Sequence, residues 1–164
     1  MEGVVVRTEL PAIVEQVLPW HAVINEVELG FALQREYRHH ADRLSPVLRE
    51  RVARSMTVPA VDYLTALDRV PHVAGAFDEY FEHYDAILTP AALGAAPRGL
   101  GYTGNPIMQT VWSFGGLPSL SLPLLYLSGG LPLGVQAVGA CHNDARLLRS
   151  TRWLVEEFIQ RSRA

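Results

Sequence analysis

The sequence predicts an α/β fold in which helices cover a mixed sheet. Short β-branched or apolar runs end at proline or glycine, as buried strands do. Longer segments between them repeat apolar residues at helical spacing. The order along the chain is strand, helices, strand, helix, two strands and helix, and this order favours helices layered on a sheet with few strands.

The first part of the chain is predicted to be a strand followed by a helix. Residues 4–10 begin with three valines and form the expected strand, which Pro11 ends. A helix is expected over residues 20–38, with Pro19 near its start. Its apolar side is predicted to consist of Trp20, Val23, Ile24, Val27 and Phe31.

Two further helices are expected before the next strand. Ser45 and Pro46 provide an N-cap and a first-turn proline for a helix that ends near residue 55. Another helix spans residues 57–70, and Pro71 is expected to kink or split it. The inward residues of this helix and of its continuation are predicted to be Val61, Leu64, Leu67, Phe77, Phe81 and Tyr84.

The second half is predicted to hold three strands and two helices. Strands are expected at residues 86–88, 120–125 and 134–138, and a turn at residues 128–130 joins the last two. A loop covers residues 91–104 and a short helix follows at 106–113. Asn143 is expected to cap a final helix. The inner side of that helix is predicted to be Leu147, Leu148, Thr151, Leu154, Val155 and Phe158.

Composition limits the classes of function. The 164 residues make one domain at most, or part of a larger one. A net charge of −3 and a pI near 6.0 give no general attraction to nucleic acid or anionic lipid. The most apolar stretch, residues 117–140, is interrupted by proline and glycine, so we expect no membrane span. We therefore expect neither nucleic acid nor membrane as a partner.

Cysteine content and the N-terminus indicate a cytoplasmic protein. The single cysteine, Cys141, cannot form an internal disulfide and fits a reducing compartment. The chain starts Met1-Glu2-Gly3 and shows no signal peptide.

Candidate nucleophiles in the sequence lack partners. All 14 basic residues are arginine, so no catalytic lysine exists in the chain. Ser119 and Ser121 alternate with leucines, which is typical of a strand whose small residues face another layer. Cys141 would need the adjacent His142 as its base, and neighbouring residues in an extended segment point apart. We therefore expect no catalytic residue in this chain.

Cofactor and metal sites are not expected either. Residues 99–104 match G-x-G-x-x-G, but no strand precedes them and no acidic residue follows about 20 positions on. Glu36, His39, His40 and Asp42 cluster near a helix end, without H-E-x-x-H spacing, and are interpreted as a solvated surface.

Several strings in the second half carry a family resemblance. Residues 84–90 read Y-D-A-I-L-T-P, and residues 103–123 read T-G-N-P-I-M-Q-T-V-W-S-F-G-G-L-P-S-L-S-L-P. G-L-P-L-G-V-Q-A-V-G and N-D-A-R-L-L follow. Together they resemble the C-terminal part of amidase-signature hydrolases. The resemblance is specific over residues 84–148 and diffuse over residues 4–72, so the whole chain, 1–164, is interpreted as an incomplete domain of that family.

The resemblance implies a function and a site. Such amidases hydrolyse carboxamide C–N bonds with a Ser-Ser-Lys triad that lies upstream of the matched region, so this segment is expected to be inactive alone. The loop after Y-D-A-I-L-T-P and the next short helix would form one wall of the acyl pocket. The wall residues implied here are Tyr102, Thr103, Asn105, Gln109 and Trp112.

Two alternatives to an amidase segment remain open at this stage. The chain could be a stand-alone, non-catalytic binding protein, or one half of a split amidase. Strands cut from a larger sheet would leave unpaired edges and an apolar face. We therefore expect a homo-oligomer formed through that face, with the N-terminal amidase half as the other candidate partner.

Overall fold

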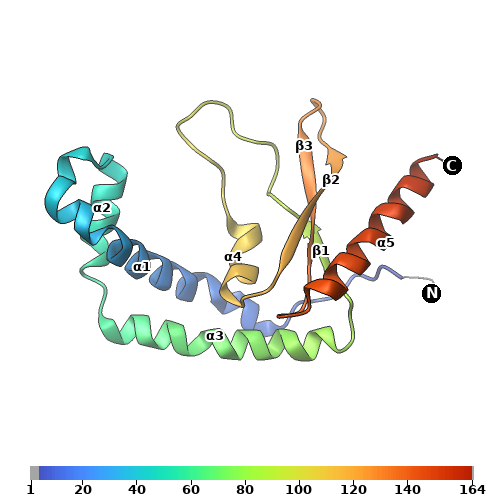
Figure 1. Ribbon diagram of the computed structural model, residues 1–164, viewed down its shortest axis with the longest axis horizontal. Coiled ribbons are helices and arrows are strands. Elements are labelled where there is room, and N and C mark those ends of the chain that lie inside the picture. Colours follow the sequence, from blue (N-terminus) through green and yellow to red (C-terminus); the bar gives the residue numbers. More distant parts are fainter. Residues whose placement is uncertain (1–3, 164) are drawn as a thin grey trace.

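An antiparallel sheet of three strands stands between the last helix of the chain on one side and, on the other, a pair of long helices that extend to the far end of the molecule (Figure 1). This computed structural model describes residues 4–163; the residues at the very N-terminus, including the segment in which no signal peptide is expected, lie outside this range. The strands are β1 (Ile87–Pro90), β2 (Ser119–Tyr126) and β3 (Pro132–Val138), in the order β1-β3-β2. The predicted α/β class is confirmed.

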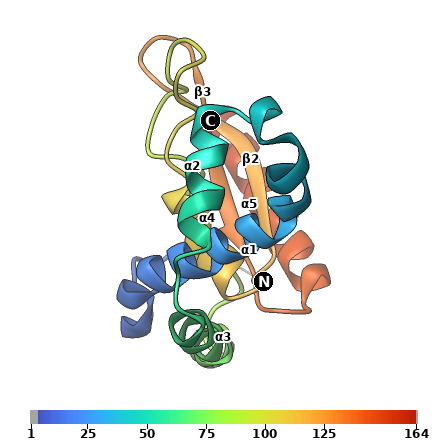
Figure 2. The same ribbon diagram turned by 90° about the vertical axis from the view of Figure 1, so that its left-hand side faces the viewer.

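The helical part begins with a 3-10 turn, Ala12–Gln16, and continues as α1 (Val17–His40). A second 3-10 turn, Ala41–Arg43, leads into α2 (Pro46–Ser55), and α3 (Ala60–Phe81) returns to the sheet. Figure 2 shows α2 nearest the viewer, at the end of the molecule away from the sheet. The 24 residues of α1 and the 22 of α3 give the molecule its length.

The start of α2 follows the sequence prediction. Ser45 is the N-cap, and its hydroxyl oxygen accepts a hydrogen bond from the Leu48 amide at 3.3 Å. Pro46 occupies the first helical position, where its missing N–H costs nothing because that donor would be unpaired in any case.

Pro71 does not split its helix. α3 runs without interruption from Ala60 to Phe81. Pro71 lies on the exposed side, where water can satisfy the carbonyl that loses its donor. Val73 and Phe77 are buried on the opposite side, and their packing holds the helix together past the proline.

Residues 4–10 do not form the predicted strand. They pair with no strand among the described residues, and Val4, Val5 and Val6 are 80%, 66% and 55% exposed. The run of valines favours an extended chain, but a strand also needs a neighbour for its backbone groups. The described part of the chain offers none to this segment, so it stays unpaired there.

The second half contains the predicted elements with shifted ends. α4 covers Ile107–Phe114 and α5 covers Asp144–Arg163. A glycine turn joins β2 to β3, with Gly129 and Gly130 at positive φ and the Gly130 amide bonded to the Leu127 carbonyl at 3.0 Å. The carbonyl of Asn143, just before α5, accepts hydrogen bonds from the amides of Arg146 and Leu147.

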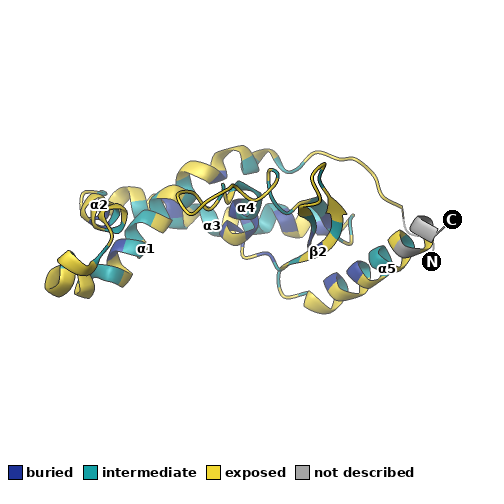
Figure 3. Ribbon diagram, turned by 90° about the horizontal axis from the view of Figure 1, so that it is seen from above, coloured by how far each residue is buried: buried dark blue, intermediate teal, exposed yellow. Residues whose placement is uncertain are grey.

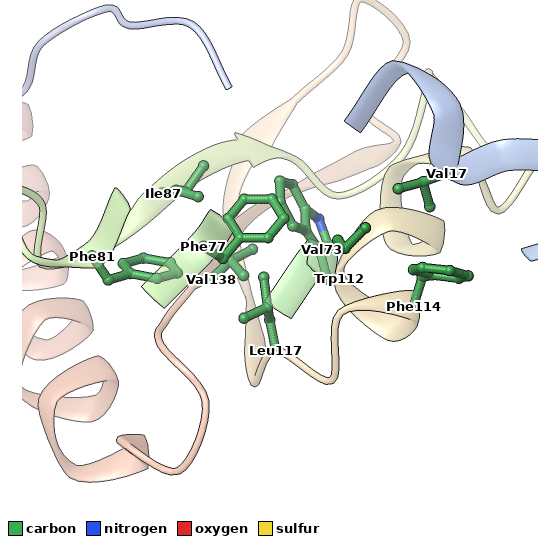
Figure 4. Packing of buried hydrophobic residues seen from close by; sticks show 9 residues of the cluster. All are labelled: Val17, Val73, Phe77, Phe81, Ile87, Trp112, Phe114, Leu117 and Val138. Carbon is green, nitrogen blue, oxygen red and sulfur yellow. The ribbon is translucent and has the colours of Figure 1, made fainter. Parts of the chain in front are cut away.

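The core lies where α3 and α4 pack on one face of the sheet (Figure 4). Phe77 and Trp112 meet edge to face, with ring centroids 5.7 Å apart. The buried cluster comprises Val17, Val73, Phe77, Phe81, Ile87, Trp112, Phe114, Leu117 and Val138.

Exposed residues alternate with buried ones along the long helices (Figure 3), and several residues predicted to point inward are among the exposed ones. They are Phe31, Val61, Leu64, Leu148 and Phe158, with exposed fractions of 74%, 66%, 62%, 58% and 38%. Their spacing is helical, but these side chains remain partly or largely accessible to solvent on α1, α3 and α5. Helical spacing of apolar residues alone therefore does not show which side of a helix is buried.

None of the described helices is both long and apolar enough to cross a bilayer.

Candidate functional site

A row of polar side chains crosses the sheet on the face that packs against α4. The strand register places Thr89 of β1 beside Gln136 of β3, and Gln136 beside Ser121 of β2. Residues paired across antiparallel strands point to the same face, so the three side chains form one row. Gln136 lies at its centre and is 3% exposed.

The side-chain amide of Gln136 makes hydrogen bonds through both its nitrogen and its oxygen. Its Nε2 donates to the Met108 carbonyl at 3.0 Å and to the Thr89 hydroxyl at 3.4 Å. Its Oε1 accepts from Gln109 Nε2 at 3.3 Å. A buried amide needs such partners, because an unsatisfied one costs free energy. Gln136 therefore fixes α4 against β1 and β3.

Gln109 connects this row to the loop at residues 91–106. The Gln109 Nε2 also donates to the carbonyl of Ala91, which directly follows β1. Gly134 lies alongside, and a Cβ added there would meet Ser121 Oγ at 2.5 Å and Ala91 Cβ at 3.1 Å. Only glycine permits the loop and the strands to approach so closely.

The other predicted wall residues occupy different surroundings. Tyr102 is 60% exposed, and Thr103 is exposed in the same loop. Asn105 stands before α4, where its Oδ1 accepts from the Ile107 amide at 3.0 Å. The structure thus places two of these residues on the loop, one at the helix start and Gln109 in the polar row.

Trp112 lies in the core. It is 4% exposed and packs against Phe77 of α3. Its indole Nε1 is buried and has no hydrogen-bond partner among the described residues. In this structure Trp112 therefore anchors α4 to the core, whereas Gln109, one turn earlier in the same helix, faces the polar row.

Two open grooves flank α4. One, of about 440 Å³, is lined by Asn105 and Thr110 together with side chains of α1 and α2. Glu26 in this groove pairs with Arg54 at 2.8 Å and with Arg51 at 3.4 Å. The other, of about 530 Å³, lies between α1, α3 and α4 and includes Ile24, Leu67 and Phe114.

The discounted nucleophiles have no base beside them. Ser119 and Ser121 are exposed on β2, and neither has a hydrogen bond to a carboxylate or imidazole in the described part of the chain. Burial raises the pKa of the Cys141 thiol, and Asp78 adds to the effect. Its Sγ donates to the Gly116 carbonyl at 3.0 Å, so the thiol acts as a structural donor.

Residues 4–163 contain no group of three or more His, Cys, Asp or Glu side chains arranged to hold a metal ion. His39 and His40 have ring centroids 6.5 Å apart, and both are exposed at the end of α1.

The arrangement defines a scaffold with a neutral hydrogen-bonding wall. Its hydrogen bonds come from amides and hydroxyls, which can bind or orient a carboxamide but do not supply a base at neutral pH. This wall belongs to an antiparallel three-stranded sheet with α4 packed on one face and β1 and β2 as its edge strands.

That match is to the amidases. The family profile described as Amidase matches residues 31–148, so the chain belongs to the amidase-signature family. The putative amidase AmiD of Mycobacterium bovis is 30% identical over 134 residues, which are 76% of this chain and 28% of that protein. A glutamyl-tRNA(Gln) amidotransferase subunit from Agathobacter rectalis is 35% identical over 95 residues, 54% of this chain and 19% of that protein.

A solved structure described as the crystal structure of an amidase has the same arrangement of elements. The TM-score is 0.79 at 25% sequence identity, and the match covers 91% of this chain and 37% of that one. The chain therefore spans less than two fifths of the solved relative and less than a third of the curated ones.

Of the two glutamines in the polar row, the family resemblance implies a site role for Gln109 and none for Gln136, which falls in the strand expected at residues 134–138. One signal could have found it. A glutamine between the valine and alanine positions of a buried strand must find partners inside the protein.

Proposed function

We propose that this chain is the C-terminal segment of an amidase-signature hydrolase that cleaves carboxamide C–N bonds, and that it has no hydrolytic activity alone. The observation that carries the proposal is the family match together with the absence of lysine from the sequence. A Ser-Ser-Lys triad cannot be completed within a chain that has no lysine. The catalytic groups must come from other residues, either upstream in a longer polypeptide or on a separate chain.

In the complete enzyme this segment would supply one wall of the acyl pocket. The wall would consist of the loop with Tyr102, Thr103 and Asn105 and the side of α4 that carries Gln109. The bond from Gln109 Nε2 to Ala91 supports this role, because it fixes the loop relative to α4. Trp112 would act from the core by holding α4 in place. The single cysteine fits a reducing compartment, so we propose the cytoplasm as the location.

The first test uses the purified chain and a reactive fluorophosphonate, followed by mass spectrometry. We expect no adduct on Ser119 or Ser121, because no base is present to activate either hydroxyl. A stoichiometric adduct on one of them would overturn the claim that the chain is inactive alone.

The second test asks whether this chain can complete a working amidase when the upstream part is supplied. The upstream part of the similar amidase AmiD is joined to this chain in one polypeptide, and hydrolysis of a simple carboxamide is measured. We expect activity from the chimera and none from either part alone. The matched control replaces Gln136 by Leu in the chimera and should lower activity, because the loop loses its anchor. A chimera that folds cooperatively and remains inactive would contradict the proposal.

A further inference from the structure

Two side-chain amides of the polar row are each held in one orientation by a backbone carbonyl. The Met108 carbonyl accepts from Gln136 Nε2, and the Ala91 carbonyl accepts from Gln109 Nε2. A carbonyl oxygen can only accept, so the nitrogen of each amide must face its carbonyl. Gln136 Oε1 then receives the second hydrogen of Gln109 Nε2, with 3.3 Å between the heavy atoms. Both N–H groups of Gln109 are therefore used inside the protein.

This arrangement leaves the oxygen of Gln109 as its outward atom. Gln109 is half-buried, and its Oε1 receives no hydrogen bond from the described residues. Among those residues the fully buried polar atoms without a partner are Trp112 Nε1 and Thr151 Oγ1, so Gln109 Oε1 is open to solvent. A freely rotating glutamine offers both donors and an acceptor, whereas Gln109 offers only an acceptor.

The Ser121 hydroxyl lies next to the residue that holds Gln109. Ser121 is paired with Gln136 in the strand register and is exposed. A Cβ on Gly134 would lie 2.5 Å from Ser121 Oγ and 3.1 Å from Ala91 Cβ, so Ser121 and Ala91 flank the same point of β3. Ser121 Oγ makes no hydrogen bond within the described part of the chain, and its O–H is free to donate.

The surroundings of Gln109 and Ser121 carry almost no charge. Residues 86–143 include a single residue of the types Asp, Glu, Lys and Arg, which is Arg98 in the exposed loop. An ammonium group bound at Gln109 Oε1 would lack a counter-ion, and a carboxylate would face that oxygen with its own negative charge. The two side chains therefore favour a group without formal charge.

A carboxamide matches these two side chains in polarity and in charge. Its N–H can donate to Gln109 Oε1, and its C=O can accept from the Ser121 hydroxyl. We propose that Gln109 and Ser121 determine specificity by binding a second, non-reacting carboxamide in the acyl group of the substrate. Gln136 does not touch that group and acts as a positioning residue, because it sets the orientation of Gln109. The inference rests on the proposed function, since it takes Gln109 to be part of the acyl-pocket wall.

The test uses the chimera with the upstream part of AmiD and measures ammonia release from four small amides. Succinamide carries the second carboxamide, and methyl succinamate replaces it by an ester without a donor. Succinamate and β-alaninamide replace it by a negative and a positive charge. After correction for the two equivalent ends of succinamide, its kcat/KM should exceed that of each other amide by about tenfold, as expected for one hydrogen bond to a positioned acceptor.

Two variants of the chimera remove the two contacts separately. Gln109→Leu should bring kcat/KM for succinamide to within about twofold of methyl succinamate, because only succinamide donates to Oε1. Ser121→Ala should lower both of these substrates about fivefold relative to β-alaninamide, which has no second C=O. A merely structural loss would lower all four amides together. The matched control is Ser119→Ala, which is exposed on the same strand and should keep every preference.

The orientation of Gln109 can be measured on the unmodified purified chain by NMR. Its Nε2 protons should exchange with water at least about tenfold more slowly than those of Gln16, because both are hydrogen-bonded and Gln16 is exposed.

The outcomes separate this inference from the proposed function. An active chimera with equal kcat/KM for succinamide and methyl succinamate overturns the inference alone. So does a preference that survives Gln109→Leu, because it would then come from the upstream part, and so does exchange at Gln109 as fast as at Gln16. A folded chimera that is inactive on all four amides contradicts the proposed function, and the inference falls with it.

Discussion

Gln136 shows how a single side chain can organise a mostly apolar sheet. Its three hydrogen bonds reach a strand, a helix and the side chain that anchors the loop. A buried amide is more demanding than a leucine of the same size, because every polar atom requires a correctly placed partner. That demand specifies one position of α4 relative to the sheet.

Replacing Gln136 by Leu should reduce the free energy of unfolding by about 1–3 kcal/mol, the cost of leaving buried partners unsatisfied. The Thr89 hydroxyl, the Met108 carbonyl and the Gln109 amide would all lose a partner. Urea denaturation followed by circular dichroism measures the change. Ser119→Ala, at an exposed position of β2, serves as the control and should stay within about 0.5 kcal/mol. Equal stability of the Gln136→Leu variant and the unmodified chain would refute the role given to the network.

The contact between α1 and α2 depends on a glycine. Gly30 is buried against Ser55, and a Cβ added to Gly30 would lie 1.7 Å from Ser55 Oγ and 2.5 Å from Ser55 Cβ. The Ser55 hydroxyl donates to the Val52 carbonyl at 2.7 Å, which holds it in this position. The two helices therefore pack at a distance that no larger residue allows.

Gly30→Ala should destabilise the chain by about 1–3 kcal/mol through overpacking. Ser55→Gly in the same molecule should restore at least half of the loss, because the next Ser55 atom lies 3.9 Å away. Gly75→Ala in α3 is the matched control. No atom lies within 4 Å of its added Cβ, so it should stabilise by about 0.5–1 kcal/mol. Thermal unfolding of these variants and of the unmodified chain measures the effects. The predictions are wrong if Gly75→Ala destabilises the chain, or if Ser55→Gly fails to restore stability to the Gly30→Ala variant.

Features that depend only on neighbouring residues could be predicted from the sequence. The Ser45 cap and the glycine turn after β2 are confirmed, since both depend on neighbouring residues. The strand expected over residues 4–10 and a split of the helix at Pro71 are both absent from the described residues. Pairing of the first segment requires a distant strand, and packing of Val73 and Phe77 overrides the local effect of the proline.

The candidate site was predictable only in part. Gln109 lies in the polar row, but its bonds to Ala91 and Gln136 join residues 18 and 27 positions apart in sequence. Such contacts follow from strand register, which the sequence strings do not specify. The position of Trp112 in the core, instead of on the surface, has the same origin.

At the scale of the whole molecule, the main feature is an excess of surface. Apolar stripes on α1 and α3 continue past their buried positions to Phe31, Val61 and Leu64. These apolar side chains are open to solvent in this structure, and the chain spans 19% of one curated relative and 37% of one solved relative.

Unfolding of this chain as a monomer should expose less new surface than its length suggests. An unfolded chain of this mass exposes about 26,000 Å². From a native area of 11474 Å² the gain is about a fifth smaller than for an ordinary domain. The denaturant m-value is proportional to that gain and should therefore be about a fifth lower than expected for 164 residues. A urea titration measures it, and an m-value at the ordinary level would mean that the monomer is more compact than this structure.

The strand order β1-β3-β2 also has a consequence for synthesis on the ribosome. The central strand is the last of the three in sequence, and it ends at Val138. As translation proceeds, β1 and β2 emerge first, and neither pairs with the other in the finished sheet. Their backbone groups stay unmatched until β3 arrives, so this sheet can assemble only after residue 138 has been made.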